Sequence, residues 1–225
     1  MVERTPKTIY YCWFGDGELS ATAQKCLLSW ERYAPGYCIT RCDERLFDIE
    51  STPWTKAAYA AGKYAYVADY VRFWAVYNFG GVYMDLGSEL VRDITSLCET
   101  YSPFSAIEEL SKTVNTGLIV AAPRHNPLLA EVLDAYDSTQ FSDDTGFLND
   151  HTVLEAHGFV RENRGQNVGE WTLLPSSAFN PVYGFGGYHI KNDTYSVHHY
   201  SASWAEPKFR TKGKIVRLLS PFIGR

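Results

Sequence analysis

The first 42 residues consist of two short apolar runs separated by an amphipathic segment, and this order constrains the fold more than any other feature. Lys7 to Phe14 is rich in aromatic residues and ends at Gly15-Asp16-Gly17, which predicts a buried strand followed by a loop. Ser20 is a favourable cap for a helix that runs to about Tyr33. A second strand is predicted from Tyr37 to Cys42. A strand, a helix and a strand in succession favour an α/β fold with a mostly parallel, nucleotide-binding type of sheet.

The same patterns place the later elements. Helices are predicted at 54–61, 64–78, 127–137 and 152–157, and strands at 81–86, 88–91, 104–107 and 117–121. Gly80-Gly81 ends the helix at 64–78, with a glycine in the left-handed conformation. Loops and short strands are expected from Gln166 onward, with a turn at 185–187. We expect one domain over 1–207 and a basic amphipathic tail over 208–225.

Composition excludes several classes of protein. With 21 basic and 26 acidic residues, the chain has a net charge of −5 and no basic block, so nucleic acid is not an expected partner. Its 5 cysteines are odd in number and lack a Cys-x-x-Cys pair, which favours neither a disulfide framework nor a zinc site. No segment is typical of a leader or a membrane span, which predicts a cytoplasmic protein. The basic tail could bind the anionic surface at the inner face of a membrane, or it could pack on the domain.

Asp85 is the leading candidate for a functional residue. It ends the apolar strand at 81–86, at the edge where an open α/β sheet presents its ligands, and alternation places its side chain with that of Tyr83. The alternative is that Asp85 only caps a turn before Gly87. On the preceding helix, Asp69 and Arg72 share one face, either as part of a site or as a solvated pair that contributes about 0.3–0.5 kcal/mol.

Five stretches, taken together, resemble one family in order and spacing. They are Tyr11-Cys12-Trp13-Phe14-Gly15, the segment from Tyr64 to Arg72, the segment from Tyr77 to Asp85, Asn115-Thr116-Gly117, and the segment from Tyr195 to Trp204 with its His-His and Ser-Trp pairs. This set is similar to the glycosyltransferase family 32 enzymes with a DxD sugar-binding region, and it spans nearly the whole chain.

The resemblance implies a GT-A fold, a nucleotide-diphosphate sugar donor, a divalent Mn²⁺ or Mg²⁺, and transfer with retention, often in building bacterial polysaccharides. Carried over by position, Trp13 would stack on the base, Asp69 and Arg72 would hold the ribose or donor sugar, and Asp85 would contact the ribose and metal. His199 would approach the metal and diphosphate, and Trp204 the leaving phosphate. The expected donor-binding residues are Trp13, Asp69, Arg72, Asp85, His199 and Trp204. Asp85, Arg72 and Asn115 are the expected catalytic residues, although without the resemblance Trp13 suits a core position and Asn115 a turn.

The chain departs from the family at one position, because Asp85-Leu86-Gly87 stands where the family has Asp-x-Asp. The expected metal ligands are therefore Asp85, His199 and, as a substitute for the missing carboxylate, Glu89. A second interpretation is metal-independent transfer, in which His198, His199, Arg72 or a lysine of the tail supplies positive charge. A third is that catalysis is lost and binding alone remains.

The leading hypothesis is a retaining glycosyltransferase that moves a hexose from a nucleotide-diphosphate sugar, uridine-based, to a hydroxyl of a glycan or lipid-linked acceptor. One rival is a noncatalytic nucleotide-sugar-binding relic of such an enzyme, which Gly87 motivates. Another is a glycoside hydrolase that pairs Asp85 with Glu89 or Asp150.

Overall fold

The computed structural model describes residues 4–109, 111–142, 149–183 and 187–199. The predicted turn at 185–187 lies largely outside these residues, and Trp204 and the basic tail at 208–225 lie wholly outside them. Within the described part, one seven-stranded sheet has the order β2-β1-β3-β6-β5-β8-β7. Its strands are β1 Thr8–Cys12, β2 Cys38–Cys42, β3 Gly81–Tyr83, β5 Phe104–Ala106, β6 Val120–Ala122, β7 Gln166–Val168 and β8 Trp171–Leu174.

The sheet is mixed and mostly parallel, as the sequence predicts. β1 pairs in parallel with both β2 and β3, and β5 pairs in parallel with β8. β6 runs antiparallel to β3 and β5, and β7 runs antiparallel to β8. Five of these seven strands therefore point the same way, and their carboxyl ends meet at one edge of the sheet.

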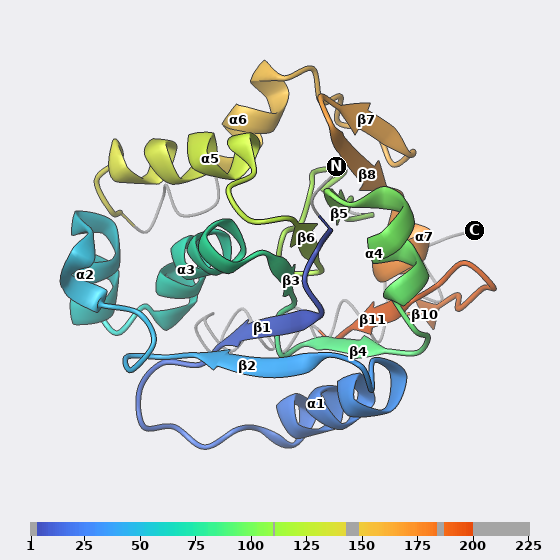
Figure 1. Ribbon diagram of the computed structural model, residues 1–225, viewed down its shortest axis with the longest axis horizontal. Helices are drawn as coiled ribbons and strands as arrows, with labels where there is room; N and C mark the ends of the chain where they lie inside the picture. Colours follow the sequence, from blue (N-terminus) through green and yellow to red (C-terminus); the bar gives the residue numbers. More distant parts are fainter. Residues whose placement is uncertain (1–3, 110, 143–148, 184–186, 200–225) are drawn as a thin grey trace.

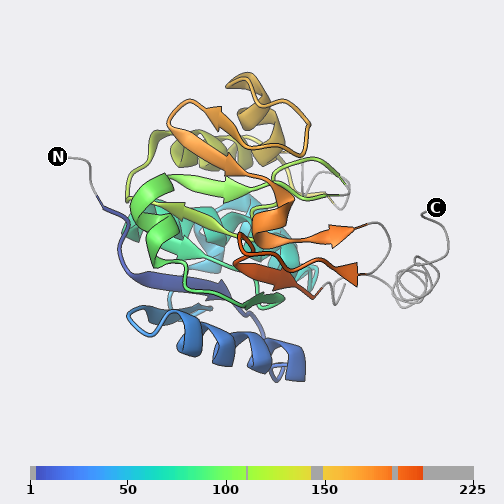
Figure 2. The same cartoon turned by 90° about the vertical axis from the view of Figure 1, so that its right-hand side faces the viewer.

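Helices cover both faces of the sheet (Figure 1). The elements are α1 Ala21–Tyr33, η1 Ile49–Ser51, α2 Pro53–Ala60, α3 Tyr64–Phe79, α4 Thr95–Tyr101, α5 Pro127–Asp137, α6 Asn149–Ala156 and α7 Ser176–Phe179. Figure 2 shows the sheet between α1 on one side and α5 and α6 on the other. Alternation along the strands divides the core: Tyr10 and Tyr83 pack in the cluster with α2, α3 and α5, whereas Ile9 and Val82 pack in the cluster with α1 and α4.

Local signals account for the start of α1 and the end of α3. The Ser20 hydroxyl accepts the Ala23 N–H at 3.1 Å, so α1 begins where its cap predicts, and Cys26 and Trp30 are buried on its inner stripe. α3 ends at Gly80, whose N–H donates to the Val76 carbonyl at 2.8 Å. Gly80 has the positive φ that the sequence predicts, 66°, but its ψ of 170° is extended rather than left-handed helical.

In three predicted elements, one boundary differs from the structure by three residues. β3 ends at Tyr83 rather than 86, and β6 covers 120–122 rather than 117–121. Both shifts have one cause, since the Asp85 N–H donates to the Gly117 carbonyl at 2.9 Å and residues 115–118 form a turn. α6 begins three residues before its predicted start, and α4 and α7 are not predicted, because neither has a side-chain cap at its start.

Four further short strands complete the described fold. β4 Ser88–Leu90 pairs antiparallel with β11 Ser196–His198, and β9 Val182–Tyr183 pairs antiparallel with β10 Gly187–Tyr188. β4 follows directly after the turn that contains Asp85, so the pairing with β11 brings the two histidines at 198 and 199 beside that turn. Among the described helices, none is long and apolar enough to cross a membrane.

Candidate donor site

Two neighbouring strands bring Trp13 and Asp85 to one edge of the sheet. β1 and β3 pair in parallel with Ile9 opposite Val82, and each candidate residue follows the end of its strand. The Trp13 indole N–H donates to the Gly17 carbonyl at 2.7 Å, and its side chain is half-buried. Trp13 is therefore held on the loop after β1 with part of its ring accessible, which corrects the alternative that places it in the core.

The Asp85 carboxylate is fixed by the residue that precedes it on the same side of the strand. The Tyr83 hydroxyl donates to Asp85 Oδ1 at 2.7 Å, as the alternation predicts. Burial and the neighbouring Asp85 raise the pKa of Tyr83 well above its usual value, so the phenol keeps its proton and donates. The Asp85 carbonyl also accepts the Ser88 N–H at 2.8 Å. The Asp85 backbone thus forms a turn before Ser88, as the alternative interpretation predicts. Its carboxylate takes no part in that turn and is fixed by Tyr83.

Arg72 lies between two carboxylates. Its Nη2 atom is 2.7 Å from Asp69 Oδ1 and 3.6 Å from Asp85 Oδ1. Nη1 donates to the Thr116 hydroxyl at 3.0 Å, and the guanidinium lies over the Tyr83 ring at 5.1 Å. Asp69 and Arg72 are only 3% and 8% exposed, which overturns the alternative of a solvated helical ion pair.

The charge of Arg72 is secured by this arrangement. Burial alone would lower the pKa of the Arg72 guanidinium, but Asp69 and Asp85 raise it well above its usual value. The site therefore holds a permanent cation next to Asp85. Since Asp85 has 35% of its side chain accessible, it is the most exposed of the three charged groups.

The segment after β5 lies beside Asp85. Asn115 Oδ1 accepts the Gly117 N–H at 3.0 Å, so Asn115 shapes a turn, as its alternative interpretation predicts. Its Nδ2 atom lies 3.4 Å from Glu108 Oε1. A Cβ atom built on Gly117 would lie 2.9 Å from Asp85 Cγ and 3.1 Å from Asn115 Oδ1. Gly117 therefore allows the predicted catalytic residues Asp85 and Asn115 to approach each other.

Sequence reasoning assigns no role to Glu108, Thr116 or Gly117. Thr116 and Gly117 belong to the Asn-Thr-Gly stretch that the sequence singles out, so the glycine could have been recognised as a place of close approach. Glu108 follows β5 without any motif around it, and nothing in the sequence marks it.

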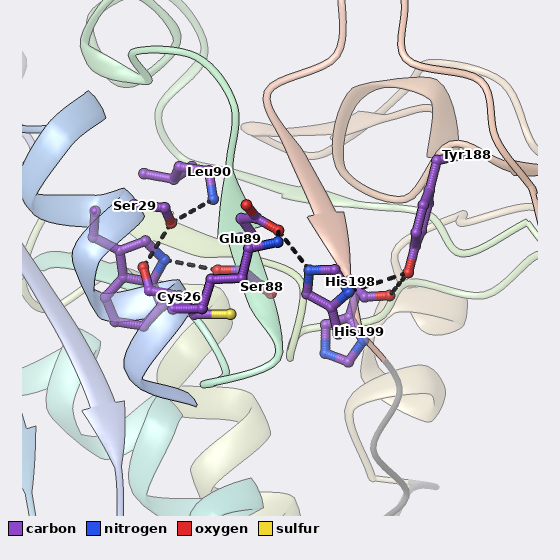
Figure 3. A network of polar contacts seen from close by, with 10 residues as sticks. Cys26, Ser29, Ser88, Glu89, Leu90, Tyr188, His198 and His199 are labelled. Atoms are coloured by element: carbon purple, nitrogen blue, oxygen red, sulfur yellow. Dashed lines mark hydrogen bonds and ion pairs between the residues drawn. The ribbon is translucent and has the colours of Figure 1, made fainter. Parts of the chain in front are cut away.

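Glu89 and His199 contact each other rather than Asp85. Glu89 Oε2 lies 2.6 Å from His199 Nε2 and 2.7 Å from Lys25 Nζ, and the Tyr188 hydroxyl lies 3.5 Å from His199 Nδ1 (Figure 3). Burial tends to raise the pKa of Glu89, but the hydrogen bonds from Lys25 and His199 bring it below the usual value of a glutamate. Glu89 is therefore an ionised group that anchors His199.

The predicted metal ligands do not converge in this structure. Within the described residues, no group of three or more His, Cys, Asp and Glu side chains could hold a metal ion. Asp85 contacts Tyr83 and Arg72, whereas Glu89 and His199 bond each other. The side chains present thus fit a divalent cation poorly, and the assignment of Asp85, Glu89 and His199 as metal ligands stays a prediction.

Part of the chain that contains this site is similar to a known protein family. Residues 20–104 match the family model described as "Glycosyltransferase sugar-binding region containing DXD motif". These residues are a glycosyltransferase sugar-binding region. The match includes Asp69, Arg72, Asp85 and Glu89, while membership of family 32 in particular stays a resemblance. No curated protein matches the chain.

Solved glycosyltransferase structures share the fold. "PaToxG Glycosyltransferase" has a TM-score of 0.56 and 17% identity over 69% of this chain and 70% of its own. "Crystal structure of a glycosyltransferase involved in the glycosylation of the major capsid of PBCV-1" has a TM-score of 0.53 and 13% identity over 94% of this chain and 99% of its own. These matches confirm the predicted GT-A fold. At 17% and 13% identity, the similarity extends to the fold and not to the substrates of these two proteins.

Proposed function

We propose that this glycosyltransferase moves a hexose, with retention, from a uridine-based nucleotide-diphosphate sugar to a hydroxyl of a glycan or lipid-linked acceptor. The observation that carries the proposal is the placement of Arg72 between Asp69 and Asp85, 2.7 and 3.6 Å away, at the edge of the sheet where Trp13 is accessible. A flat ring, an accessible carboxylate and a fixed cation suit a base, the hydroxyls of a sugar and a diphosphate respectively.

The burial of the three charged groups divides their roles. Asp85 is accessible enough to meet the donor, where its carboxylate can accept hydrogen bonds from ribose or sugar hydroxyls. Asp69 is 3% exposed, so it acts by holding Arg72 in place. Arg72 then fixes the Asp85 carboxylate and provides positive charge beside the leaving diphosphate.

Retention without a covalent intermediate requires attack on the face that the diphosphate leaves. The bond between the anomeric carbon and the phosphate oxygen breaks, the acceptor oxygen bonds to the same carbon, and the departing phosphate oxygen takes the acceptor proton. In such a reaction, the protein contributes mainly position and charge. The fixed contacts of Asp85 with Tyr83 and Arg72 suit that role, since they are formed before the donor arrives.

Mn²⁺ or Mg²⁺ would supply charge neutralisation to the diphosphate in an enzyme with a complete Asp-x-Asp motif. Here the described residues contain no cluster of three or more His, Cys, Asp and Glu side chains that could hold such an ion. A lipid-linked acceptor would bring the enzyme to the inner face of a membrane, and unchanged liposome binding after removal of residues 208–225 would exclude their part in that contact.

The experiment that tests the proposal is release of nucleoside diphosphate from a panel of uridine, guanosine and thymidine diphosphate sugars, with each donor assayed with Mn²⁺, Mg²⁺ and chelator. Asp85→Asn is expected to abolish turnover, because it removes the charge that Tyr83 and Arg72 hold in place. Asp134→Asn, at an exposed position on α5, is the matched control and is expected to turn over normally.

Gly87 favours one alternative, a noncatalytic protein that binds a nucleotide sugar. Folded wild-type protein that binds a nucleotide sugar but releases no nucleoside diphosphate from any donor, with or without acceptor glycans, would establish the alternative. Binding of none of these donors would contradict both.

A further inference from the structure

Gly87 lies against the imidazole of a residue 111 positions later in the chain. A Cβ atom built on Gly87 would be 2.9 Å from Nε2 and 3.0 Å from Cε1 of His198, and 3.3 Å from the His199 carbonyl oxygen. Cβ atoms essentially never approach other heavy atoms within 3.0 Å. The space that a side chain at position 87 would enter is therefore already taken by the His198 ring.

The backbone around His198 is anchored on both sides. His198 is paired with Ser88 between β11 and β4, and the His199 N–H donates to the Gly87 carbonyl at 2.7 Å. On the other side, the Tyr188 hydroxyl donates to the His198 carbonyl at 2.9 Å. Figure 3 shows the two histidines between Glu89 and Tyr188. The ring therefore cannot leave position 87 without disturbing these contacts or changing its rotamer.

The turn that contains Gly87 also contains Asp85. The hydrogen bond from the Ser88 N–H to the Asp85 carbonyl closes the turn at 2.8 Å, so Gly87 lies two residues from the accessible carboxylate of the donor site. His198 is half-buried, and its ring lies against Gly87 in this turn. The family region is named for a DXD motif, whereas residues 20–104 of this chain contain no Asp-x-Asp.

We propose that His198 replaces the missing second carboxylate and binds the diphosphate directly. The imidazole N–H donates a hydrogen bond to an anionic phosphate oxygen, at the place where a carboxylate at position 87 would otherwise hold a cation. This inference rests on the proposed function, and it makes Gly87 and His198 a coupled pair. A carboxylate at 87 needs the imidazole removed, and the imidazole needs a residue without a side chain at 87.

The test compares wild type with His198→Ala, Gly87→Asp and the double variant Gly87→Asp/His198→Ala. Uridine diphosphate binding is measured by calorimetry with chelator and with Mn²⁺, and Mn²⁺ binding to the free proteins is followed by electron paramagnetic resonance. His157→Ala is the matched control, because His157 contacts Glu131 on α5, away from the site.

With chelator, wild type and His157→Ala are expected to bind uridine diphosphate equally, and His198→Ala at least tenfold more weakly. Gly87→Asp should melt at a lower temperature than wild type, and adding His198→Ala should restore the melting temperature, because the ring that the new side chain meets is gone. The double variant is expected to bind Mn²⁺ and to bind uridine diphosphate only when Mn²⁺ is present.

Three results would overturn the inference: unchanged uridine diphosphate affinity of His198→Ala with chelator, loss of wild-type binding on chelation, or a Gly87→Asp melting temperature equal to that of wild type. These are distinct from failure of the proposed donor site, in which wild type would bind no uridine diphosphate under either condition, and from loss of catalysis alone, in which wild type would bind uridine diphosphate but turn over no donor.

Discussion

Arg72 Nη2 lies 2.7 Å from Asp69 Oδ1 in a part of α3 where both side chains are almost fully buried. If one partner of this buried ion pair is removed, little water is available to solvate the charge that remains. The pair also orients the cation toward the Asp85 carboxylate, so the stability of the helix and the geometry of the candidate donor site depend on the same contact.

Removing the cation is expected to destabilise the fold. Arg72→Ala leaves Asp69 buried without its charged partner, and we expect a loss of about 3–5 kcal/mol in the free energy of unfolding. Urea denaturation followed by tryptophan fluorescence measures it. Arg161→Ala removes an exposed ion pair with Glu155, and its expected cost is below about 1 kcal/mol. Equal urea midpoints for the two variants would contradict the role assigned to Arg72.

A methyl group at position 117 is expected to damage the site while leaving the fold intact. The Cβ atom of Gly117→Ala would overlap the Asp85 carboxylate, which must then leave its contacts with Tyr83 and Arg72. We expect at least tenfold weaker uridine diphosphate binding by calorimetry. Gly36→Ala is the control, since a Cβ atom there meets nothing within 4 Å. The prediction fails if both variants bind like wild type.

Trp13 is expected to contribute to affinity through its ring. Trp13→Ala removes the surface on which the base would stack, and stacking of one base on an aromatic side chain contributes about 1–3 kcal/mol, or roughly a 5- to 150-fold change in affinity. Trp13→Phe keeps a ring but loses the bond to the Gly17 carbonyl, so an intermediate affinity for uridine diphosphate is expected. If the base does not lie on Trp13, the Trp13→Phe and Trp13→Ala variants will bind uridine diphosphate with equal affinity.

Asp137 should make the protein slightly less stable at neutral pH. Burial raises the pKa of Asp137, the hydrogen bond from Tyr70 opposes this, and Asp134 raises it further. Asp137 is also the last residue of α5, where a negative charge opposes the helix dipole. Because the folded pKa is the higher one, the cost is absent below the unfolded pKa and grows as pH rises through the folded pKa.

Asp137→Asn should therefore raise the melting temperature at pH 7, by a small amount since the side chain is exposed and screened by solvent. The difference from wild type should shrink as the pH is lowered past the range where aspartates titrate. Calorimetric melting at a series of pH values checks it, and a lower melting temperature for the variant at pH 7 would contradict the sign.

Features encoded locally are the ones that the sequence predicts well. The Ser20 cap, the Tyr83–Asp85 alternation and the stop at Gly80 all depend on residues within a few positions of each other. The sequence also predicts that Asp69 and Arg72 share a helix face. It does not predict their burial, because a helix pattern with charges on one face is the same whether water or another segment covers that face.

Contacts between distant segments could not be predicted in the same way. Thr116 bonds Arg72 from 44 positions away, and His198 meets Gly87 only because β11 pairs with β4. The family resemblance predicts a second carboxylate at the position of Gly87, and from its absence the sequence favours Glu89 as a substitute. The structure instead joins Glu89 to His199 and Lys25, since the pairing with β11 places the His199 ring within reach of Glu89.

The pairing of β4 with β11 also sets the order in which the site is completed during synthesis. Asp69, Arg72 and Asp85 leave the ribosome together with α3 and β3, but His198 and His199 follow more than 100 residues later. A nascent chain without β11 carries the charged half of the site and lacks the imidazole half. The two halves of the candidate site can therefore come together only after the chain has been translated as far as β11.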